Sequence, residues 1–296
     1  SDLFLPLSSL FLPSLTFLLI FCATQVATAQ VPSYVPTNGL VGYWPFNGNA
    51  NDESGNGNNG TVNGATLTQD RNGNVNAAYS FDGVDNFIEI SSSIELSITG
   101  DITLSSWVNT GGSNNQNYQT IISKAESYWS WEYLMTLSYH TGIIHAGKML
   151  TARALGMGNQ EQAWSILPYS ISNWELWTTV YSAGQVRIYK NGVLDLTQSF
   201  SLVPNNNNGS LLFGRQNTSD FEEQFLGKLD DIGIWNRALT ADEVLALYNG
   251  CNVTPIAIAG NNAPGAFSTS TYTCDNNAGS TYNWTVSNGV IASGQG

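Results

Sequence analysis

The chain has 296 residues, enough for one large β domain of about 200 residues with smaller segments at its ends. Only 10% of the residues are charged, the formal net charge is −13, and the nine Lys and Arg residues are scattered singly. Because neutralising phosphates requires clustered cations, this composition argues against a nucleic-acid partner, whereas it suits divalent cations and neutral sugars.

The N-terminus predicts a secretory signal peptide over residues 1–29. Residues 3–23 form an apolar run rich in Leu and Phe, and Ala27-Thr28-Ala29 supplies the small residues that precede a cleavage site. A signal anchor is the alternative, because the run approaches membrane-spanning length. We therefore expect an exported bacterial protein, secreted or on the cell surface, with no membrane insertion after cleavage and with residues 30–38 as a linker.

Short strand-like runs recur between turn signals from residue 40 to residue 235. In chain order they are Leu40–Phe46, Thr61–Leu67, Ala77–Phe81, Phe87–Ile90, Ile102–Val108, Leu176–Tyr181, Gln185–Lys190, Leu194–Thr197, Ser210–Gly214 and Phe225–Trp235. Asn191-Gly192 between two of these runs predicts a hairpin, since both turn residues need positive φ. The runs do not alternate with helices, so the sequence predicts an all-β, two-sheet antiparallel sandwich rather than a parallel α/β sheet.

One short helix is predicted at the end of this region. Thr240-Ala241-Asp242-Glu243 has the Ser/Thr-x-x-Glu pattern of a capping box, and Asn249-Gly250 closes the helix. We expect the helix to pack on a sheet edge and to end the domain. Beyond it, residues 251–296 hold too few strand candidates for a sandwich and predict the start of a second domain. Whether Cys251 and Cys274 pair is left open by their spacing.

Four segments resemble the LamG-like jelly-roll family of the concanavalin A-like lectin/glucanase (laminin-G) superfamily. They are residues 39–57 (GLVGYWPFNGNANDESGNG), 78–88 (AYSFDGVDNFI), 102–108 (ITLSSWV) and 227–240 (GKLDDIGIWNRALT). The resemblance implies a jelly-roll sandwich over residues 39–250, export, and use as a binding or adhesion module. Residues 282–289 (YNWTVSNG) resemble the first strands of a PKD-like domain of immunoglobulin type, which implies an incomplete Ig-like segment over residues 251–296.

The stretch Asn49–Gly60 consists almost entirely of glycines and side chains that carry oxygen. Ca²⁺ takes six to eight oxygen ligands from flexible loops, so this composition suits a structural calcium site. The family resemblance implies that the loop lies beside the last predicted strand. The expected ligands are Asp52, Asn56 and one of Asp230 and Asp231, with Asp82 and Asp85 as further candidates. The alternative is that Asn and Gly only populate left-handed turn conformations here.

Two other patterns are expected to carry no chemistry. Residues 55–60 match G-x-G-x-x-G, but a strand-like run follows instead of the helix that a dinucleotide site requires. His140 and His145 have no Cys or further His nearby, so we expect ordinary surface or partly buried imidazoles rather than a metal site.

An aromatic segment provides the first candidate for contact with a glycan. Aromatic faces stack on sugar rings, and adjacent carboxylates accept hydrogen bonds from hydroxyls. The candidate ligand-binding residues are Tyr128, Trp129, Trp131 and Glu132. The alternative for the tryptophans is burial in the core, which is also where we expect Trp107, Trp177 and Trp235, since these lie inside strand runs.

No catalytic motif is present in the sequence. Laminarinase-like glycosidases on this sandwich place paired carboxylates on one strand as E-x-D-x-x-E, and neither this pattern nor H-E-x-x-H or G-x-S-x-G occurs. We therefore expect a non-catalytic, calcium-stabilised module that binds a glycan or polysaccharide. One alternative is an adhesion or structural spacer that binds protein partners at the surface, and another is a divergent glycoside hydrolase.

Overall fold

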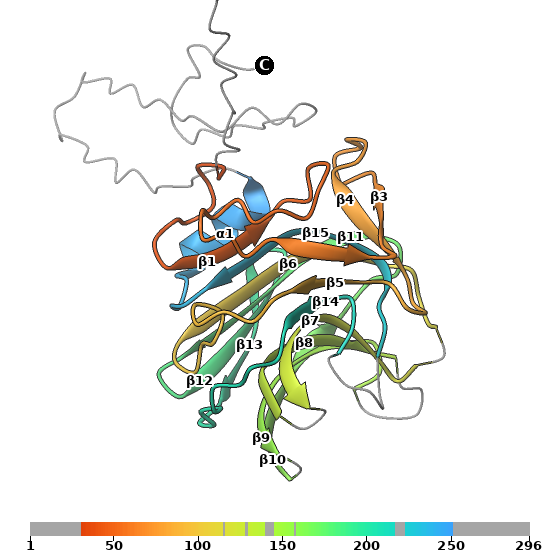
Figure 1. The fold of residues 1–296 in the computed structure, drawn as a ribbon. Helices are drawn as coiled ribbons and strands as arrows, with labels where there is room; N and C mark the ends of the chain where they lie inside the picture. The colour runs from red at the N-terminus through yellow and green to blue at the C-terminus, as the bar shows by residue number, and fades with distance from the viewer. Residues whose placement is uncertain are drawn as a thin grey trace, which may run out of the picture.

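The computed structural model describes residues 31–114, 116–127, 130–139, 145–156, 158–216 and 223–250. These residues form two antiparallel β-sheets packed face to face, which confirms the predicted fold class (Figure 1). Sheet A contains, in spatial order, β13 (Val193–Ser199), β12 (Gln185–Lys190), β11 (Trp174–Ser182), β6 (Ile102–Thr110), β15 (Leu226–Trp235), β4 (Ala78–Asp82) and β3 (Thr66–Thr68), with β1 (Leu40–Trp44) paired to β15. Sheet B contains β10 (Asn159–Pro168), β9 (Lys148–Gly156), β8 (Ser130–Ser138), β7 (Tyr118–Ser127), β14 (Leu211–Phe213), β5 (Phe87–Ile90) and β2 (Gly60–Asn63).

Every strand expected between residues 40 and 235 is present, but four of the seven strands of sheet B were not predicted. The run Thr61–Leu67 divides into β2 and β3, which belong to different sheets. The missed strands are β7, β8, β9 and β10. Residues 148–168 are rich in Ala, Leu, Met, Gln and Glu, which favour helices, and only their pairing with β8 places them in a sheet.

The core lies between the two sheets and is dominated by aromatic side chains. Trp44 from β1 and Phe213 from β14 meet edge to face with ring centroids 4.9 Å apart, and Phe46 packs against Phe213 at 6.3 Å. Trp177 of β11 is completely buried in the same cluster, as predicted. Since each buried aromatic removes on the order of 150–250 Å² from water, this cluster contributes strongly to the stability of the fold.

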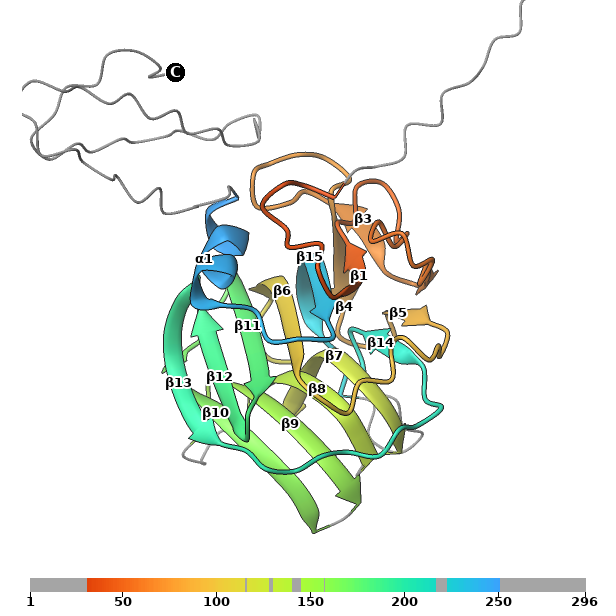
Figure 2. The ribbon, with the colours of Figure 1, turned by 90° about the vertical axis from the view of Figure 1, so that its left-hand side faces the viewer.

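The face of sheet A that points away from sheet B is also covered. Helix α1 (Ala241–Asn249) lies on this face (Figure 2), where its Val244 and Leu247 join the predicted core residues Trp107 and Trp235 in a second buried cluster. Residues 31–36, expected to be part of a linker, also pack on this face, because Tyr34 and its neighbour Val35 are buried there.

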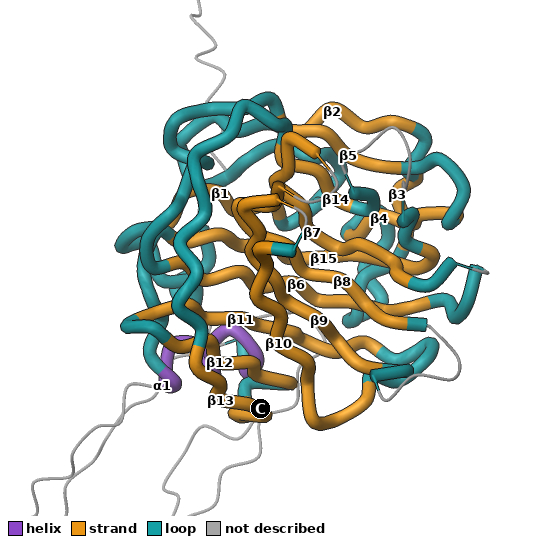
Figure 3. The backbone as a smooth tube through the Cα atoms, turned by 90° about the horizontal axis from the view of Figure 1, so that it is seen from below, coloured by secondary structure: helices purple, strands orange, loops and turns teal. Residues whose placement is uncertain are grey.

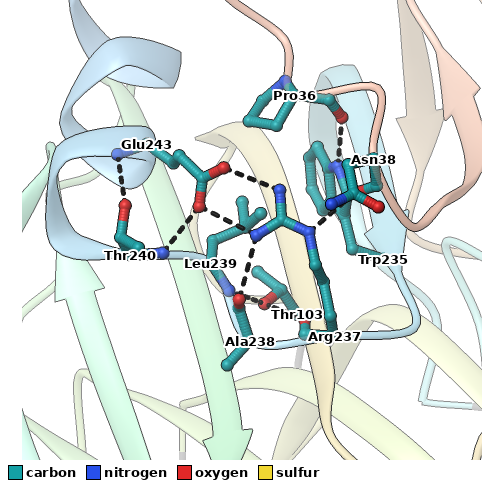
Figure 4. A network of polar contacts seen from close by, with 9 residues as sticks. All are labelled: Pro36, Asn38, Thr103, Trp235, Arg237, Ala238, Leu239, Thr240 and Glu243. Carbon is teal, nitrogen blue, oxygen red and sulfur yellow. Dashed lines mark hydrogen bonds and ion pairs between the residues drawn. The ribbon is translucent and has the colours of Figure 1, made fainter. Parts of the chain in front are cut away.

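One arginine ties these covering elements together (Figure 4). The guanidinium of Arg237 donates two hydrogen bonds to the Glu243 carboxylate, at 2.9 and 2.6 Å, and its Nε donates to the carbonyl of Asn38 at 2.7 Å. Glu243 also completes the predicted capping box with Thr240, and Gly250 ends the helix in the left-handed conformation. The hydrogen bonds to Arg237 hold the pKa of the Glu243 carboxyl below its ordinary value.

Two predictions about turns are confirmed. Asn191 and Gly192 join β12 to β13 with φ values of 52° and 77°, as the predicted hairpin requires. Residues 55–60 lead into strand β2, as predicted, and not into the helix that a dinucleotide site requires.

At one side of the sandwich the edge strands of the two sheets meet, with β10 next to β12 and β13 (Figure 3). Within the described residues no helix is long and apolar enough to cross a membrane. The expected signal peptide over residues 1–29, the PKD-like segment over residues 251–296, and Cys251 and Cys274 within it lie outside the described residues.

Candidate functional site

A polar cleft lies at the edge of sheet B, between the loop from β1 to β2 and the segment from β5 to β6. Its volume is about 360 Å³. Apart from Gly57 and the apolar Ile90, the lining consists of amide and hydroxyl side chains with a single carboxylate. The residues are Asn56, Gly57, Asn58, Asn59, Ile90, Ser91, Ser92, Ser93 and Glu95. The cleft therefore offers many hydrogen-bond donors and acceptors and almost no charge.

The first wall of the cleft is folded by Asp52, one of the predicted metal ligands. Its Oδ1 accepts hydrogen bonds from the backbone N–H groups of Tyr43 at 3.0 Å and Ser54 at 2.9 Å, and its Oδ2 accepts from Asn58 N–H at 2.9 Å. The backbone N–H of Asp52 donates to Asn59 Oδ1 at 2.9 Å. The carboxylate thus holds the loop closed through hydrogen bonds to its own backbone.

The asparagines of this wall are anchored to β1. Asn56 Nδ2 donates to the carbonyl of Val41 at 2.9 Å, and Asn58 Nδ2 donates to the same carbonyl at 3.0 Å. Ser93 Oγ donates to Asn58 Oδ1 at 3.1 Å, which links the two walls across the cleft. Since Asn58 is only 7% exposed, it forms a fixed floor.

The second wall is held from below by a buried ion pair. Lys124 Nζ lies 3.4 Å from Glu132 Oε2, and both side chains are completely buried. Lys124 Nζ also donates to Ser92 Oγ at 3.3 Å and to the carbonyl of Gly209 at 2.7 Å, while Ser97 Oγ donates to Glu132 Oε1 at 2.6 Å. Burial lowers the pKa of Lys124, and the charge of Glu132 opposes this shift.

Two further buried side chains fix the rest of this segment. Tyr133 donates its hydroxyl to the carbonyl of Leu96 at 2.9 Å, and burial raises its pKa well above the ordinary value, so the hydroxyl remains a donor. Arg153 donates to the carbonyls of Thr99 at 3.1 Å and Gly100 at 2.9 Å. Residues 92–100 are therefore held by β7, β8 and β9, the strands that the sequence did not reveal.

The predicted aromatic glycan contact is not supported by the burial of its described members. Trp131 is 4% exposed, in a cluster with Leu134 and Leu150 on the side of sheet B away from the main core. Glu132 is buried in the ion pair described above, so neither side chain offers a surface to a sugar. Tyr128 and Trp129 lie outside the described residues.

The same side of sheet B carries aromatics that sequence reasoning missed. Tyr118 and Trp164 are partly exposed, with ring centroids 6.2 Å apart, and His145 stacks on Trp164 at 4.4 Å. They come from separate places in the chain, so no local motif announces them. His140 lies outside the described residues.

Asp230 and Asp231 are bound by an arginine that the sequence analysis did not identify. Arg71 Nη1 lies 2.8 Å from Asp230 Oδ2 and 2.7 Å from Asp231 Oδ2, and its guanidinium lies over the Trp107 ring at 4.5 Å from the centroid. A bulge in β15, with Asp231 at a φ of 43°, lets two consecutive carboxylates reach the same cation. Burial and then the Asp231 charge raise the pKa of Asp230 well above its ordinary value.

The predicted metal ligands come together only in part. Tyr43 lies between Asp52 and Asp231. Its backbone N–H donates a hydrogen bond to the Asp52 carboxylate, and its side-chain hydroxyl donates one to the Asp231 carboxylate at 2.6 Å. Burial and then the charges of Asp231 and Asp52 raise the pKa of Glu53, which lies near both.

Asp82 and Asp85 lie elsewhere, in the turn from β4 to β5, where Asp82 Oδ1 accepts from Val84 N–H at 2.9 Å and Asp85 N–H at 3.3 Å. Within the described residues no group of three or more His, Cys, Asp and Glu side chains is arranged to hold a metal ion. The oxygens of Asp52 accept hydrogen bonds from backbone N–H groups, and those of Asp230 and Asp231 face Arg71.

Comparisons with solved structures give the same fold at low sequence identity. The binding domain of Paraclostridial Mosquitocidal Protein 1 superposes with a TM-score of 0.58 and 18% identity, over 72% of this chain and 52% of that domain. Domain 4 of AbnA, an extracellular arabinanase from Geobacillus stearothermophilus, was solved in complex with arabinotriose. It superposes with a TM-score of 0.55 and 21% sequence identity, over 71% of this chain and 98% of that domain. The botulinum neurotoxin DC binding domain in complex with SialylT superposes with a TM-score of 0.53 and 14% sequence identity, over 72% of this chain and 52% of that domain. The chain thus spans about half the length of the toxin domains.

No curated protein matches the sequence. The family model described as the concanavalin A-like lectin/glucanases superfamily matches residues 82–245, more than half of the chain. This match runs from the end of β4 into α1 and so includes most of both sheets. With two antiparallel sheets in this arrangement, the chain belongs to the concanavalin A-like lectin/glucanases superfamily.

Proposed function

We propose that this domain is a non-catalytic, carbohydrate-binding module of a secreted or cell-surface protein. The observation that carries the proposal is the cleft of about 360 Å³, whose polar lining is three asparagines, three serines and one glutamate. Sugars present many neutral hydroxyls, which pair with amides and hydroxyls held at fixed positions. The AbnA domain in complex with arabinotriose, which this chain covers almost completely, supports the same class of ligand.

The rigidity of both walls favours binding. Asp52 closes the first wall, and the Lys124–Glu132 pair anchors the second. A site whose groups are already ordered loses less conformational entropy when its ligand binds. The cleft is therefore preorganised for a ligand.

The carboxylates of the described residues support binding rather than hydrolysis. Glycosidases need two carboxyl groups on either side of the scissile bond, one of them as a proton donor. Glu95 is the single carboxylate among the residues that line the cleft, and the adjacent pair Asp230 and Asp231 is bound by Arg71. We expect no release of reducing sugar from any polysaccharide that the domain binds, and sustained turnover would support a glycosidase instead.

Filling the cleft is expected to abolish glycan binding. Ser91 is exposed at the end of β5 and lines the cleft, so Ser91→Phe places a ring where the sugar would lie. On a glycan array and by calorimetry we expect affinity to fall at least about ten-fold, which corresponds to about 1.4 kcal/mol. Ser199→Phe, on the exposed edge strand β13, is the matched control and should bind as the wild type does. A wild-type protein that binds no glycan would overturn the proposal.

Protein binding is a second candidate, favoured by an exposed apolar surface where β10 meets β13. Ile166 is 59% exposed and Leu194 is 52% exposed. Asp195 joins them, because its carboxylate accepts from the backbone N–H groups of Ile166 and Leu167. A related botulinum domain was solved with rat synaptotagmin II, a protein ligand. Binding of a surface protein without any glycan binding would favour this function.

Calcium binding stays a prediction, which rests on the oxygen-rich loop of residues 49–60. A bound ion would stabilise the folded state by RT ln(1 + [Ca²⁺]/Kd), about 2.7 kcal/mol at one hundred times Kd. We therefore expect millimolar Ca²⁺ to raise the melting temperature by several degrees and EGTA to reverse the rise. Mg²⁺ at the same ionic strength is the control. Equal melting temperatures in Ca²⁺ and EGTA would contradict the prediction of a stabilising calcium ion.

A further inference from the structure

The residues that line the cleft carry a single charge, and it is negative. Glu95 is the single ionisable residue in its lining, and its side chain is exposed to solvent. Asn56, Asn59 and the three serines contribute polar groups without charge, and no Lys or Arg lines the cleft. A ligand group that enters the cleft therefore meets neutral dipoles and one carboxylate.

The described cations near the cleft are not available to an anion. Lys124 lies beneath Ser92, but it is completely buried and its ammonium is already paired with Glu132 and the carbonyl of Gly209. Arg215 lies over the Phe87 ring at 4.6 Å, at the opposite end of β5 from the cleft. No described cation therefore offsets the charge of Glu95 for a bound ligand.

The net negative charge of the whole chain also disfavours anionic ligands. With a formal net charge of −13, the protein repels anions at long range when the salt concentration is low. Salt screens this long-range part, since the Debye length falls from about 30 Å at 0.01 M to about 8 Å at 0.15 M. Repulsion between two carboxylates a few ångströms apart at a surface persists at both concentrations.

From these observations, and resting on the proposed function, we infer that the cleft selects uncharged glycans and rejects glycans that carry carboxylate or sulfate groups, with Glu95 as the residue that sets this selectivity. The amides and serine hydroxyls hold the neutral sugar. Glu95 accepts a hydrogen bond from a sugar hydroxyl but repels an acidic substituent in the same position.

The test compares pairs of ligands in which one member carries an additional acidic group. The probes are the neutral oligosaccharide that binds best on the array, its 6-sulfated form, and the pair lactose and 3′-sialyllactose. We expect calorimetry to show that each neutral ligand with measurable affinity binds at least about ten-fold more tightly than its anionic form in low salt. At 0.15 M salt the ratio of neutral to anionic affinity should be smaller but should stay above one.

Two variants that each remove one negative charge separate the local effect from the global one. Glu95→Gln keeps the shape and hydrogen-bonding capacity of the side chain. It should lower the ratio of neutral to anionic affinity by about three- to ten-fold. Asp242→Asn removes an exposed carboxylate in the first turn of α1, outside the cleft, and should leave the ratio unchanged. Melting temperatures establish that both variants fold.

The outcomes distinguish the two proposals. A wild-type protein that binds neither neutral nor anionic glycans contradicts the proposed function itself. Equal binding of neutral and sulfated forms overturns the inference while glycan binding stands. An equal effect of Glu95→Gln and Asp242→Asn also overturns it, because selectivity would then come from net charge rather than from Glu95.

Discussion

Replacing Glu132 with leucine is expected to lower the free energy of unfolding by about 3–5 kcal/mol. Leucine is similar in volume, so the main effect is electrostatic: the Lys124 ammonium would stay completely buried without its anion. The carbonyl of Gly209 and Ser92 Oγ would remain as its partners, and neutral acceptors compensate only part of the cost of burying a charge. Because a typical domain has only about 5–15 kcal/mol of stability, this loss would be large.

Urea unfolding of single and double variants measures this effect. The double variant Lys124→Met/Glu132→Leu removes both charges, so it should cost clearly less than the sum of the two single substitutions. Glu126→Gln, at the exposed end of the same strand β7, is the control and should stay within about 0.5 kcal/mol of the wild type. A cost below about 1 kcal/mol for Glu132→Leu would show that the pair does not hold the wall of the cleft.

The second large effect is expected at Arg71. Arg71→Met leaves Asp230, which is 2% exposed, next to Asp231 without the shared cation, and we expect a loss of about 3–5 kcal/mol at neutral pH. The variant also loses the packing of the guanidinium on Trp107. Arg187→Met on β12 is a matched control, because the side chain of Arg187 hydrogen-bonds Gln185 rather than a carboxylate.

The loss at Arg71 should depend on pH, and its sign follows from the pKa of Asp230. Burial and the Asp231 charge raise this pKa in the folded protein and Arg71 lowers it, so the substitution raises it further. A group whose pKa is higher in the folded state favours folding at low pH and loses that contribution as pH rises through the folded value. The deficit of Arg71→Met should therefore be largest at pH 7–8 and shrink as the pH falls toward the ordinary Asp value of about 3.9. Equal deficits in urea titrations at pH 5 and pH 8 would contradict this explanation.

Two residues chosen from the sequence as ligand-binding candidates have supporting roles in the structure. Asp52, a predicted calcium ligand, accepts three backbone hydrogen bonds that fold one wall of the cleft. Glu132 was predicted to contact sugar and instead pairs with Lys124 beneath the other wall. The sequence shows that oxygen-rich or aromatic residues surround a carboxylate. Whether its oxygens face a ligand or other groups of the protein depends on how the chain folds around it.

The contact of Arg71 with Asp230 and Asp231 could not be predicted from the sequence for a different reason. Arg71 is an isolated cation in the sequence, 159 residues away from Asp230, and nothing near it suggests a partner. Their contact exists because β4 and β15 pair side by side, which brings the loop before β4 to the bulge at Asp231. The aromatics Tyr118 and Trp164 were missed for the same reason, because they meet only across the strands of sheet B.

Local patterns along the chain were sufficient to predict the all-β class, the Asn191-Gly192 hairpin, the capped helix after Thr240 and the segments that resemble the family. Short-range backbone preferences and side-chain caps encode these features locally, so they can be read without coordinates. The cleft, the buried Lys124–Glu132 pair and the contact of Arg71 with Asp230 and Asp231 became visible only in the three-dimensional structure. Those depend on strand order and register between distant segments, because register decides which side chains share a face and are withdrawn from water.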